Sequence, residues 1–500
     1  MFCAPPSDPL LAVMLASGNN PSPLEQPVYS SPSLERPIRL ASVVSALSYA
    51  LDLSTGQPEG HAIRSCILAM RIAAEIGVSP QTQNDLFYAS LIKDCGCTGN
   101  SSKTFHALGS DDLKAKHDVK TTDWTRVSWE NLQYALSHVA LGKSFLERTK
   151  AIFLLALNQK AHTHEVTKIR CERGFTLARL MGLSDATAVA IRSLDEHWDG
   201  QGLSEGLSGA TIPLLSRIML LAQTLEVFLA AYGAGPAVDV VNRRSRTWFD
   251  PNLVKAVNSL SKNDRLWTGV REEDFPTLCL AMEPEPKPIQ LGDTNLDNIC
   301  LAFSNIVDAK SPYTFNHSLG VANAAIATAR ILGLPRERIV FLRNAALLHD
   351  LGKLSVSNAI LEKPAKLDDG EWQIMKRHPF HTWNILRGIP EFGEMSEVAG
   401  SHHEKLNGSG YFRGLTGDHL SLESRILAVA DVFDALTAKR PYRDGLPSEQ
   451  VFEILRKDTP HALDAACVEA LQMSGAECNQ SFVDLQSLNH QLISYAELPH

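Results

Sequence analysis

Two related segments occur within the 500 residues of this chain, and this internal repeat constrains the fold more than any other feature. A shift of 256 residues aligns residues 50–97 with residues 306–353 without a gap. Further along, a shift of 208 residues relates a second pair of stretches. The difference, 256 − 208 = 48, places an insertion in the first copy at about residues 98–166. The main matched pairs are Asp52 with Asp308, His61 with His317, Gly77 with Gly333, Asp94 with Asp350, Gly96 with Gly352, Glu196 with Glu404, Gly202 with Gly410 and Arg217 with Arg425.

Apolar residues recur with the helical period almost throughout the chain. Residues 318–332, for example, place apolar side chains on one face of an amphipathic helix, Gly333 supplies a stop and Pro335 prevents continuation. No convincing run of alternating apolar residues indicates a strand. The predicted fold class is therefore all-α, built from two tandem helical bundle domains.

Shifts in composition mark the domain boundaries. The first residues are rich in Pro, Ser and Asn, and three prolines alternate with charges shortly after residue 282. The expected segments are a flexible leader at 1–38, the first copy at 39–281, a Pro-rich linker at 282–292, the second copy at 293–475 and a C-terminal tail at 476–500.

Charge and cysteine content exclude several classes of protein. A net charge of −9 and a sequence pI near 6.0 argue against a partner that is a nucleic-acid polymer or a membrane surface. Nine cysteines without paired spacing fit a reduced, cytoplasmic protein better than a disulfide framework. We find no secretory signal and no apolar run that approaches the ~18 residues of a membrane span.

The second copy carries imidazole and carboxylate side chains of the types that a two-metal hydrolytic site needs. Taken singly, each histidine is more often a surface or capping residue than a ligand, but the full set and its spacing favour metal binding. His349 and Asp350 end an apolar helix, where adjacent side chains can converge, and Asp431 interrupts a strongly apolar run. The candidate ligands are His317, His349, Asp350, His378, His402, His403 and Asp431.

The absence of cysteine from this set favours two divalent ions suited to nitrogen and oxygen, iron or manganese, over a structural zinc. Such a metal pair activates water and neutralises phosphoryl oxygens. We therefore expect hydrolysis of a phosphate ester.

The first copy has lost most of this set. Lys93 stands in the place of His349, Arg170 in that of His378, and Gln223 in that of Asp431, while Leu194 and Asp195 replace the adjacent histidine pair. A cation at two of these positions would repel a metal ion. We expect this copy to have a structural, dimerising or sensing role. The short Cys95-Gly96-Cys97 motif is read as two ordinary thiols rather than a zinc site.

Residues from about 293 to 475 resemble the HD-GYP domain, a family of bacterial cyclic di-GMP phosphodiesterases within the HD superfamily. The motifs that carry the resemblance are Tyr313-Thr314 before His317-Ser318, His349-Asp350-Leu351-Gly352-Lys353, Lys376-Arg377-His378-Pro379, His402-His403-Glu404 and the run from Ala430 to Thr437. The resemblance implies two tandem HD-type bundles, the first degenerate, and metal binding by the seven ligands with Asp350 bridging. It also implies a catalytic role for Asp350 and Lys353, phosphate contacts from Lys353, Arg440 and Arg443, and a nucleotide pocket lined by Tyr411.

Three positions depart from the family pattern. Tyr313 occupies the place of a glutamate that binds a third metal in some members, so two metals are favoured. The Gly-Tyr-Pro signature reads Gly410-Tyr411-Phe412, and the usual aspartate of the preceding loop is Asn407. Loss of the proline is expected to loosen the loop and to add a ring beside the pocket.

The expected substrate is cyclic di-GMP, hydrolysed to pGpG or GMP in bacterial second-messenger signalling. Two alternatives stay open: the same chemistry on another cyclic dinucleotide or a nucleotide, and a catalytically weak signalling adaptor that works through protein contacts. The oligomeric partner, a second copy of the chain or another signalling protein, is also left open.

Overall fold

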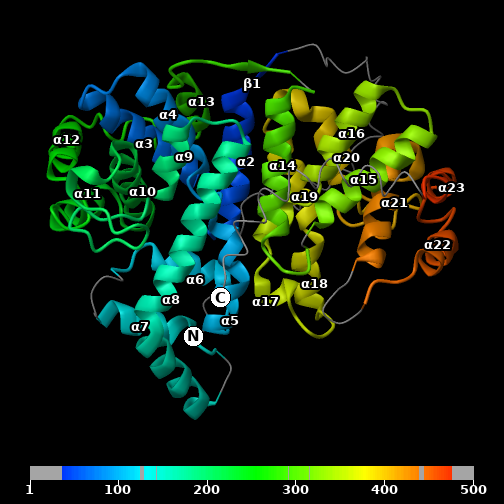
Figure 1. Cartoon of the computed structure of the whole chain (residues 1–500), viewed down its shortest axis with the longest axis horizontal. Helices are drawn as coiled ribbons and strands as arrows, with labels where there is room; N and C mark the ends of the chain where they lie inside the picture. The colour runs from blue at the N-terminus through cyan, green and yellow to red at the C-terminus, as the bar shows by residue number, and fades with distance from the viewer. Residues whose placement is uncertain are drawn as a thin grey trace, which may run out of the picture. The chain divides into compact units, whose positions relative to one another are not determined.

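The computed structural model describes residues 37–123, 129–141, 144–290, 292–314, 316–438 and 444–475. These residues form a set of packed helices and one sheet of two very short strands (Figure 1). The predicted all-α class is confirmed. The C-terminal tail at 476–500 and nearly all of the leader lie outside the described residues.

Among the residues that the structure describes, the first copy contains one short strand and twelve α-helices. Its elements are β1 (Ile38–Arg39), α2 (Leu40–Ser54), α3 (His61–Glu75), α4 (Pro80–Ile92), η1 (Cys97–Asn100), α5 (Ser101–Leu108), α6 (Asp112–Val119), α7 (Trp129–His138), α8 (Phe145–Leu180), α9 (Asp185–Arg192), η2 (Gly209–Thr211), α10 (Leu214–Tyr232), α11 (Ala234–Arg243), α12 (Pro251–Lys262) and α13 (Phe275–Ala281).

The second copy follows the other strand. That strand is β2 (Pro288–Ile289), in the linker, and the elements of the second copy are α14 (Thr294–Asp308), α15 (His317–Ile331), α16 (Arg336–Leu348), η3 (Leu351–Ser355), α17 (Asn358–Leu361), α18 (Asp369–Lys376), α19 (His378–Arg387), η4 (Pro390–Phe392), α20 (Gly393–Gly400), η5 (Gly417–His419), α21 (Leu422–Thr437), α22 (Ser448–Lys457) and α23 (Ala465–Met473).

The repeat is visible at the starts of α3 and α15, the corresponding helices of the two copies. In α3 and in α15 the first residue is a histidine, and a buried aspartate from the preceding helix accepts hydrogen bonds from the first turn. Asp52 accepts from the backbone N–H of Ala62 at 3.0 Å, and Asp308 accepts from that of Ser318 at 3.1 Å. Both carboxylates satisfy N–H groups that a helix start leaves without a partner.

Helix α15 ends where the sequence predicts, but its buried residues are not confined to one face. Gly333 follows it in a left-handed conformation, with φ of 75°. The predicted amphipathic character is wrong, because every residue from His317 to Ala329 is buried. This helix packs between α16 and α21 as a central element of the second bundle, so its exposed side is confined to its last turn.

Helix α10 is long and apolar enough to cross a membrane by length and composition, which the sequence reading overlooked. Most of it is buried, and it packs against α3. Its buried Glu226 contacts His61 Nδ1 and accepts from Arg64 Nε at 2.8 Å. An ion pair of this kind belongs to a packed core helix.

The Pro-rich linker leaves the end of the first copy and pairs with the strand at the start of that copy. Its residues Pro288 and Ile289 pair in antiparallel register with Arg39 and Ile38. Ile38 is therefore part of the folded chain, although the sequence placed it in the leader, and its side chain is buried.

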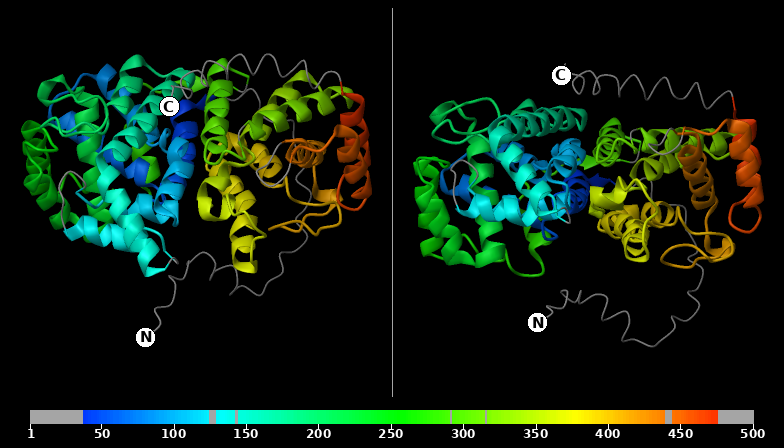
Figure 2. Two further views of the ribbon diagram at one scale, coloured as in Figure 1. Left: turned by 60° about the horizontal axis from the view of Figure 1, so that its bottom comes forward. Right: turned by 90° about the horizontal axis from the view of Figure 1, so that it is seen from below.

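The two copies share one apolar core and several polar contacts. Helix α2 packs against α3 and α4 of its own copy and also against η3 and α19 of the other (Figures 1 and 2). Asp112, in the insertion, accepts from the backbone N–H of Asn358 at 2.8 Å and from Ser357 Oγ at 3.2 Å. The insertion thus contacts the segment that directly follows the HD motif.

Candidate metal centre

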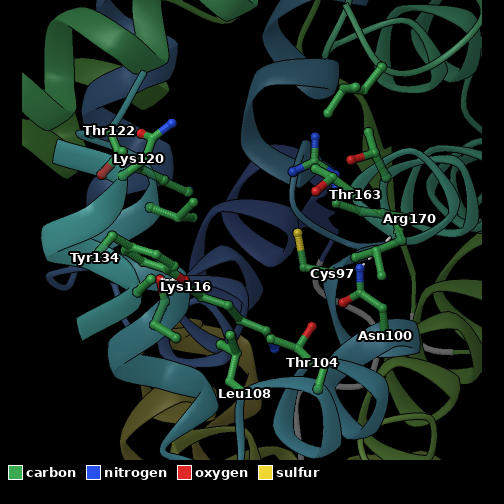
Figure 3. A pocket seen from close by; sticks show the side chains of 18 of the residues that line it. Cys97, Asn100, Thr104, Leu108, Lys116, Lys120, Thr122, Tyr134, Thr163 and Arg170 are labelled. Atoms are coloured by element: carbon green, nitrogen blue, oxygen red, sulfur yellow. Dashed lines mark hydrogen bonds between the residues drawn. The ribbon is translucent and has the colours of Figure 1, made fainter. Parts of the chain in front are cut away.

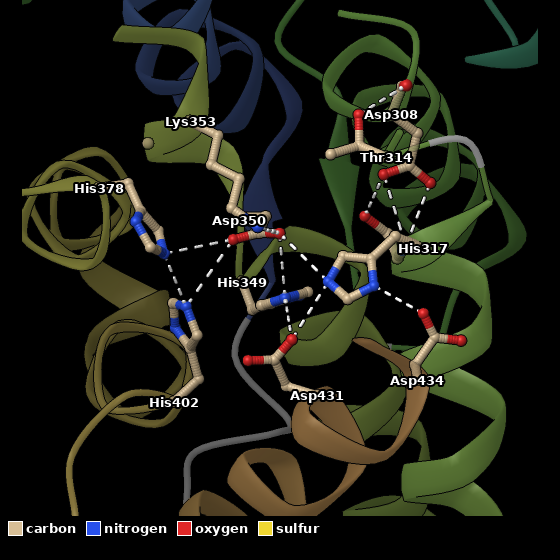
Figure 4. Close-up of polar contacts among 12 residues, drawn as sticks. Asp308, Thr314, His317, His349, Asp350, Lys353, His378, His402, Asp431 and Asp434 are labelled. Carbon is tan, nitrogen blue, oxygen red and sulfur yellow. Dashed lines mark hydrogen bonds and ion pairs between the residues drawn. The ribbon is translucent and has the colours of Figure 1, made fainter. Parts of the chain in front are cut away.

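The structure brings the seven predicted ligands together from five places in the second copy. His317 starts α15, His349 and Asp350 follow α16, and Asp431 lies within α21. His378 starts α19, and His402 and His403 follow α20. The ligands that are labelled in Figure 4 point toward one centre. All seven are buried except His403, which is partly exposed.

Asp350 occupies the middle of this cluster and presents its two oxygens to different histidines. Its Oδ2 lies 3.4 Å from His317 Nε2 and 3.3 Å from His349 Nε2. Its Oδ1 lies 3.4 Å from His378 Nε2 and 3.7 Å from His402 Nε2. The carboxylate therefore faces two separate donor groups, as a bridging ligand must.

Three of the histidines are oriented by the helix that precedes each of them. Each directs Nδ1 to the backbone carbonyl three residues earlier: His349 to Ala346 at 2.7 Å, His378 to Met375 at 2.7 Å and His402 to Ala399 at 2.6 Å. An Nδ1–H donated to a carbonyl leaves the Nε2 lone pair free to act as a ligand. The geometry at the helix ends thus sets both the tautomer and the direction of the rings.

His317 is oriented by a carboxylate that sequence reasoning quoted within a motif but gave no role. Asp434 Oδ2 lies 2.6 Å from His317 Nδ1, while His317 Nε2 lies 3.1 Å from Asp431 Oδ1. Asp434 is three residues after Asp431 on α21, so one helix supplies both a candidate ligand and the residue that positions its neighbour. The i, i+3 spacing on a helix was the signal available in the sequence.

Burial and charge give the site a mixed protonation pattern. Burial lowers the pKa values of His378 and His402 well below the ordinary histidine value and that of His403 to about 4. Burial also disfavours protonation of His349, but the carboxylates of Asp350 and Asp431 raise its pKa to about 9. These two carboxylates remain ionised, because neighbouring histidines lower their pKa values well below the ordinary range despite burial.

The donor set fits metal ions. His349 Nε2 and Asp350 Oδ1 are buried and have no hydrogen-bond partner among the described residues, which is costly unless another group compensates them. Ligand atoms lie within 4.8 Å of one another in three sets: His378 with His402 and His403, His317 with His349 and Asp431, and His349 with Asp350 and His402. Imidazole nitrogens and ionised carboxylates suit divalent cations, and a bound cation would displace the proton from His349.

The comparison with known proteins identifies the family. The chain is 39% identical over 461 residues to the 3′3′-cGAMP-specific phosphodiesterase 3 of Vibrio cholerae serotype O1, and the match covers 92% of this chain and 97% of that protein. The chain belongs to the HD-GYP family. The sequence profile of the HD domain matches it at residues 176–253 and 302–467.

Other HD-GYP relatives match mainly one part of the chain. The cyclic di-GMP phosphodiesterase response regulator RpfG of Xanthomonas campestris pv. campestris is 38% identical over 164 residues, which are 32% of this chain and 43% of that protein.

A crystal structure of a cyclic GMP-AMP-specific phosphodiesterase of V. cholerae, V-cGAP3, superposes with a TM-score of 0.61 at 36% identity. It covers 88% of this chain and 98% of that one.

The HD-GYP loop after the paired histidines is held firmly in place. Glu404 accepts from the backbone N–H of Arg413 at 3.0 Å and from that of Leu415 at 3.1 Å. In the first copy Glu196 does the same for Gly206, at 2.9 Å. Glu404 was quoted within a motif without a role, and the structure shows that it closes this loop.

The residues Tyr411 and Phe412 point in different directions. The Tyr411 ring lies 4.4 Å from that of His403, beside the cluster, whereas Phe412 packs at 5.7 Å from Phe380 and 6.3 Å from Trp383. The expectation that the new ring lies beside the pocket is wrong, because Phe412 packs against α19. The expectation that loss of the family proline loosens the loop stays a prediction. The ring fills an aromatic cluster on α19, and Glu404 holds the backbone.

Of the three residues predicted to contact phosphate, only Lys353 lies among the described residues. Lys353 Nζ lies 2.5 Å from Asp350 Oδ2. Arg440 and Arg443 lie outside the described residues, so their predicted role stays a prediction. The sequence reading did not single out Trp372, whose ring lies 6.0 Å from that of Tyr411, or assign a role to Lys376, whose Nζ lies within 5.8 Å of both ring centroids.

Gly352, in the His349-Asp350-Leu351-Gly352-Lys353 motif, is required by a close approach of the backbone at His378. A Cβ on Gly352 would lie 1.9 Å from the carbonyl oxygen of His378. We expect Gly352→Ala to displace His378 and to weaken metal affinity about 10- to 100-fold, as loss of a supporting contact does at other metal sites. Isothermal titration with Mn²⁺ measures this. Gly393→Ala is the control, because a Cβ there meets nothing within 4 Å. Equal affinity in both variants would contradict the prediction.

In the first copy, cations occupy the space around the aspartate that corresponds to Asp350. Lys93 Nζ lies 2.5 Å from Asp94 Oδ2, and Lys120 Nζ lies 3.5 Å from Asp94 Oδ1 and 3.3 Å from His61 Nε2. Arg170 pairs with Asp195. The degenerate HD copy thus satisfies its buried carboxylate with ammonium groups, and Lys120 comes from the insertion.

Proposed function

We propose that this chain is a metal-dependent phosphodiesterase that hydrolyses a cyclic dinucleotide, with 3′3′-cGAMP as its substrate. The observation that carries the reaction class is the position of Asp350, whose two oxygens face two histidine groups in a buried site. The substrate follows the similarity to a 3′3′-cGAMP-specific enzyme over nearly the full length of both chains. This choice revises the cyclic di-GMP expected from the family resemblance.

We assign residues 293–475 as the catalytic domain and residues 39–281 as a copy without metal chemistry. One metal would be held by His317, His349 and Asp431, the other by His378, His402 and His403, with Asp350 shared; iron or manganese suits these donors. When bound, the ions supply a water activated for attack and neutralise charge on the phosphoryl oxygens.

The protein's own residues orient and shield the reacting phosphate. The backbone carbonyls behind His349, His378 and His402 hold the imidazoles in one tautomer, so the site is arranged before substrate binds. Lys353 places a cation beside Asp350, where it can contact a phosphoryl oxygen. Cleavage of one P–O3′ bond, with addition of water, leaves a linear dinucleotide with a 5′-phosphate.

Trp372, Tyr411 and Lys376 form a platform for one base of the substrate. The Tyr411 ring adjoins the candidate ligands His403 and His378, and the Trp372 ring adjoins Tyr411. Trp372 is 39% exposed. Bases stack on exposed aromatic rings with a gain of about 1–3 kcal/mol each.

Removal of this platform should weaken substrate binding and leave the rate of the chemical step nearly unchanged. We expect Trp372→Ala to raise KM by about 5- to 100-fold with little change in kcat, because the ring contacts no candidate metal ligand in the described structure. Steady-state kinetics on 3′3′-cGAMP measure both values. Trp129→Ala, at an exposed tryptophan of α7, is the matched control. An unchanged KM would remove Trp372 from the pocket.

The deciding experiment compares substrates. Protein purified without oxygen and supplied with Fe²⁺ or Mn²⁺ is incubated separately with 3′3′-cGAMP and cyclic di-GMP, and the nucleotides are separated by chromatography. We expect linear product from 3′3′-cGAMP at a higher kcat/KM than from cyclic di-GMP. The reverse preference would favour the second candidate, which rests on the similarity to RpfG. No product from either by metal-loaded protein would contradict the phosphodiesterase and favour an adaptor.

A further inference from the structure

A cavity of about 440 Å³ lies in the first copy, beside its degenerate metal site. Its walls come from α5, α6 and α7 of the insertion and from α8 (Figure 3). The catalytic copy has no counterpart of this insertion in the sequence alignment. The volume falls within the range of about 300–1,000 Å³ that is usual for small-molecule sites.

Most of the cavity lining is apolar, and its polar groups include three cations. Figure 3 shows Lys116 and Lys120 on one side and Arg170 on the other. The apolar lining residues include Ala107, Leu108, Ala115, Val119, Ala135 and Ile152. Such a lining suits a ligand with an apolar body and few charged groups.

The end of the cavity at the degenerate site carries an excess of positive charge. Lys93, Lys120 and Arg170 gather there against two carboxylates, Asp94 and Asp195. His61 adds no further charge, since burial lowers its pKa to about 4, and Glu226 beside it is paired with Arg64. Lys116 is balanced separately by Asp112 at 3.2 Å.

Burial and the neighbouring Lys93 also lower the pKa of Lys120, which Asp94 only partly offsets. A bound anion beside Lys120 and Arg170 would compensate the remaining charge. In the catalytic copy the corresponding space is the candidate metal centre, where cations would meet phosphate. The first copy carries its cations on side chains instead.

We propose that this cavity binds a small organic anion, with its anionic group between Lys120 and Arg170 and its apolar body against the insertion. The ligand class is an aromatic or aliphatic molecule with one phosphate, sulfonate or carboxylate group. The proposal concerns a second site and does not depend on which substrate the catalytic domain hydrolyses.

The test uses the full chain, loaded with Mn²⁺, and the fluorescent probe 8-anilinonaphthalene-1-sulfonate, which has an aromatic body and one anionic group. We expect saturable binding of one probe per chain at this site. Lys120→Met should weaken it about tenfold or more through loss of a charge-assisted contact, and Ala107→Trp should abolish it by filling the cavity. N-Phenyl-1-naphthylamine, which lacks the sulfonate, should bind at least about tenfold more weakly than the anionic probe.

Two control variants separate this site from others. Lys168→Met removes an exposed lysine of α8 near Arg170 that does not line the cavity, and Trp372→Ala alters the aromatic platform of the catalytic copy. Both should bind the probe as the parent chain does. Circular dichroism establishes that each variant is folded; if Lys120→Met is not, Ala107→Trp, which keeps every charge, decides. Undiminished binding by folded Ala107→Trp, or equal affinity for the neutral probe, would overturn the proposal.

Discussion

Replacing Asp350 with alanine should remove metal from both halves of the candidate centre, whereas replacing His378 should remove it from one. Asp350 faces four histidines through two oxygens, but His378 contacts only the Oδ1 side. We expect metal per chain to fall close to zero in Asp350→Ala and by about half in His378→Ala. Metal analysis by mass spectrometry of proteins loaded under identical conditions measures this difference.

Hydrolysis should fall with the metal. Metal ions contribute several kcal/mol of transition-state stabilisation, and each 1.36 kcal/mol is a factor of ten, so kcat/KM should drop by roughly three orders of magnitude or more in Asp350→Ala. His419→Ala is the matched control, since this exposed histidine of the same copy contacts Thr416 and lies outside the cluster. Full metal content in Asp350→Ala would show that the ions bind elsewhere.

The repeat and the family pattern were readable from the sequence because they rest on spacing along the chain. Two shifts matched His61 with His317 and Glu196 with Glu404, and the structure gives the members of each pair the same place, at a helix start or bonded to the following loop. Apolar periodicity located the ends of α15 and α16 well. It could not show that α15 is buried on all sides, because this depends on which helices pack around it.

The supporting contacts of the site were not readable in the same way. Thr382 Oγ1 donates to the carbonyl of His349 at 2.8 Å and accepts from the backbone N–H of Gly352 at 2.9 Å, so it clamps the HD turn from a helix 30 residues away. Nothing in the local sequence marks this threonine. Lys120 was missed for a related reason: it lies in the insertion and has no partner in the other copy to point to its role.

The largest stability effect outside the catalytic copy should follow from Asp94→Ala. This change leaves the buried ammonium of Lys93 and the neighbouring Lys120 without their carboxylate. Removal of one partner from a buried ion pair costs about 3–5 kcal/mol, because a charge then stays buried and uncompensated. We expect a lower urea midpoint for the chain, followed by circular dichroism, with the metal content of the folded protein unchanged.

A double-mutant cycle measures the interaction energy between Asp94 and Lys93. Burial opposes ionisation of Asp94, but Lys120 and Lys93 hold its pKa well below the ordinary aspartate value. Its stabilising contribution is therefore present at neutral pH and is lost only as the pH falls below the ordinary aspartate range.

In the parent chain Lys93→Met should destabilise, but in the Asp94→Ala background the same change should cost less or even stabilise, since it removes an unpaired charge. Additive effects of the two changes, or a loss below about 0.5 kcal/mol for Asp94→Ala, would mean that the ammonium groups do not replace metal as the compensation for this carboxylate. A coupled result would instead explain how a domain that lost four of the five ligand histidines kept its aspartate.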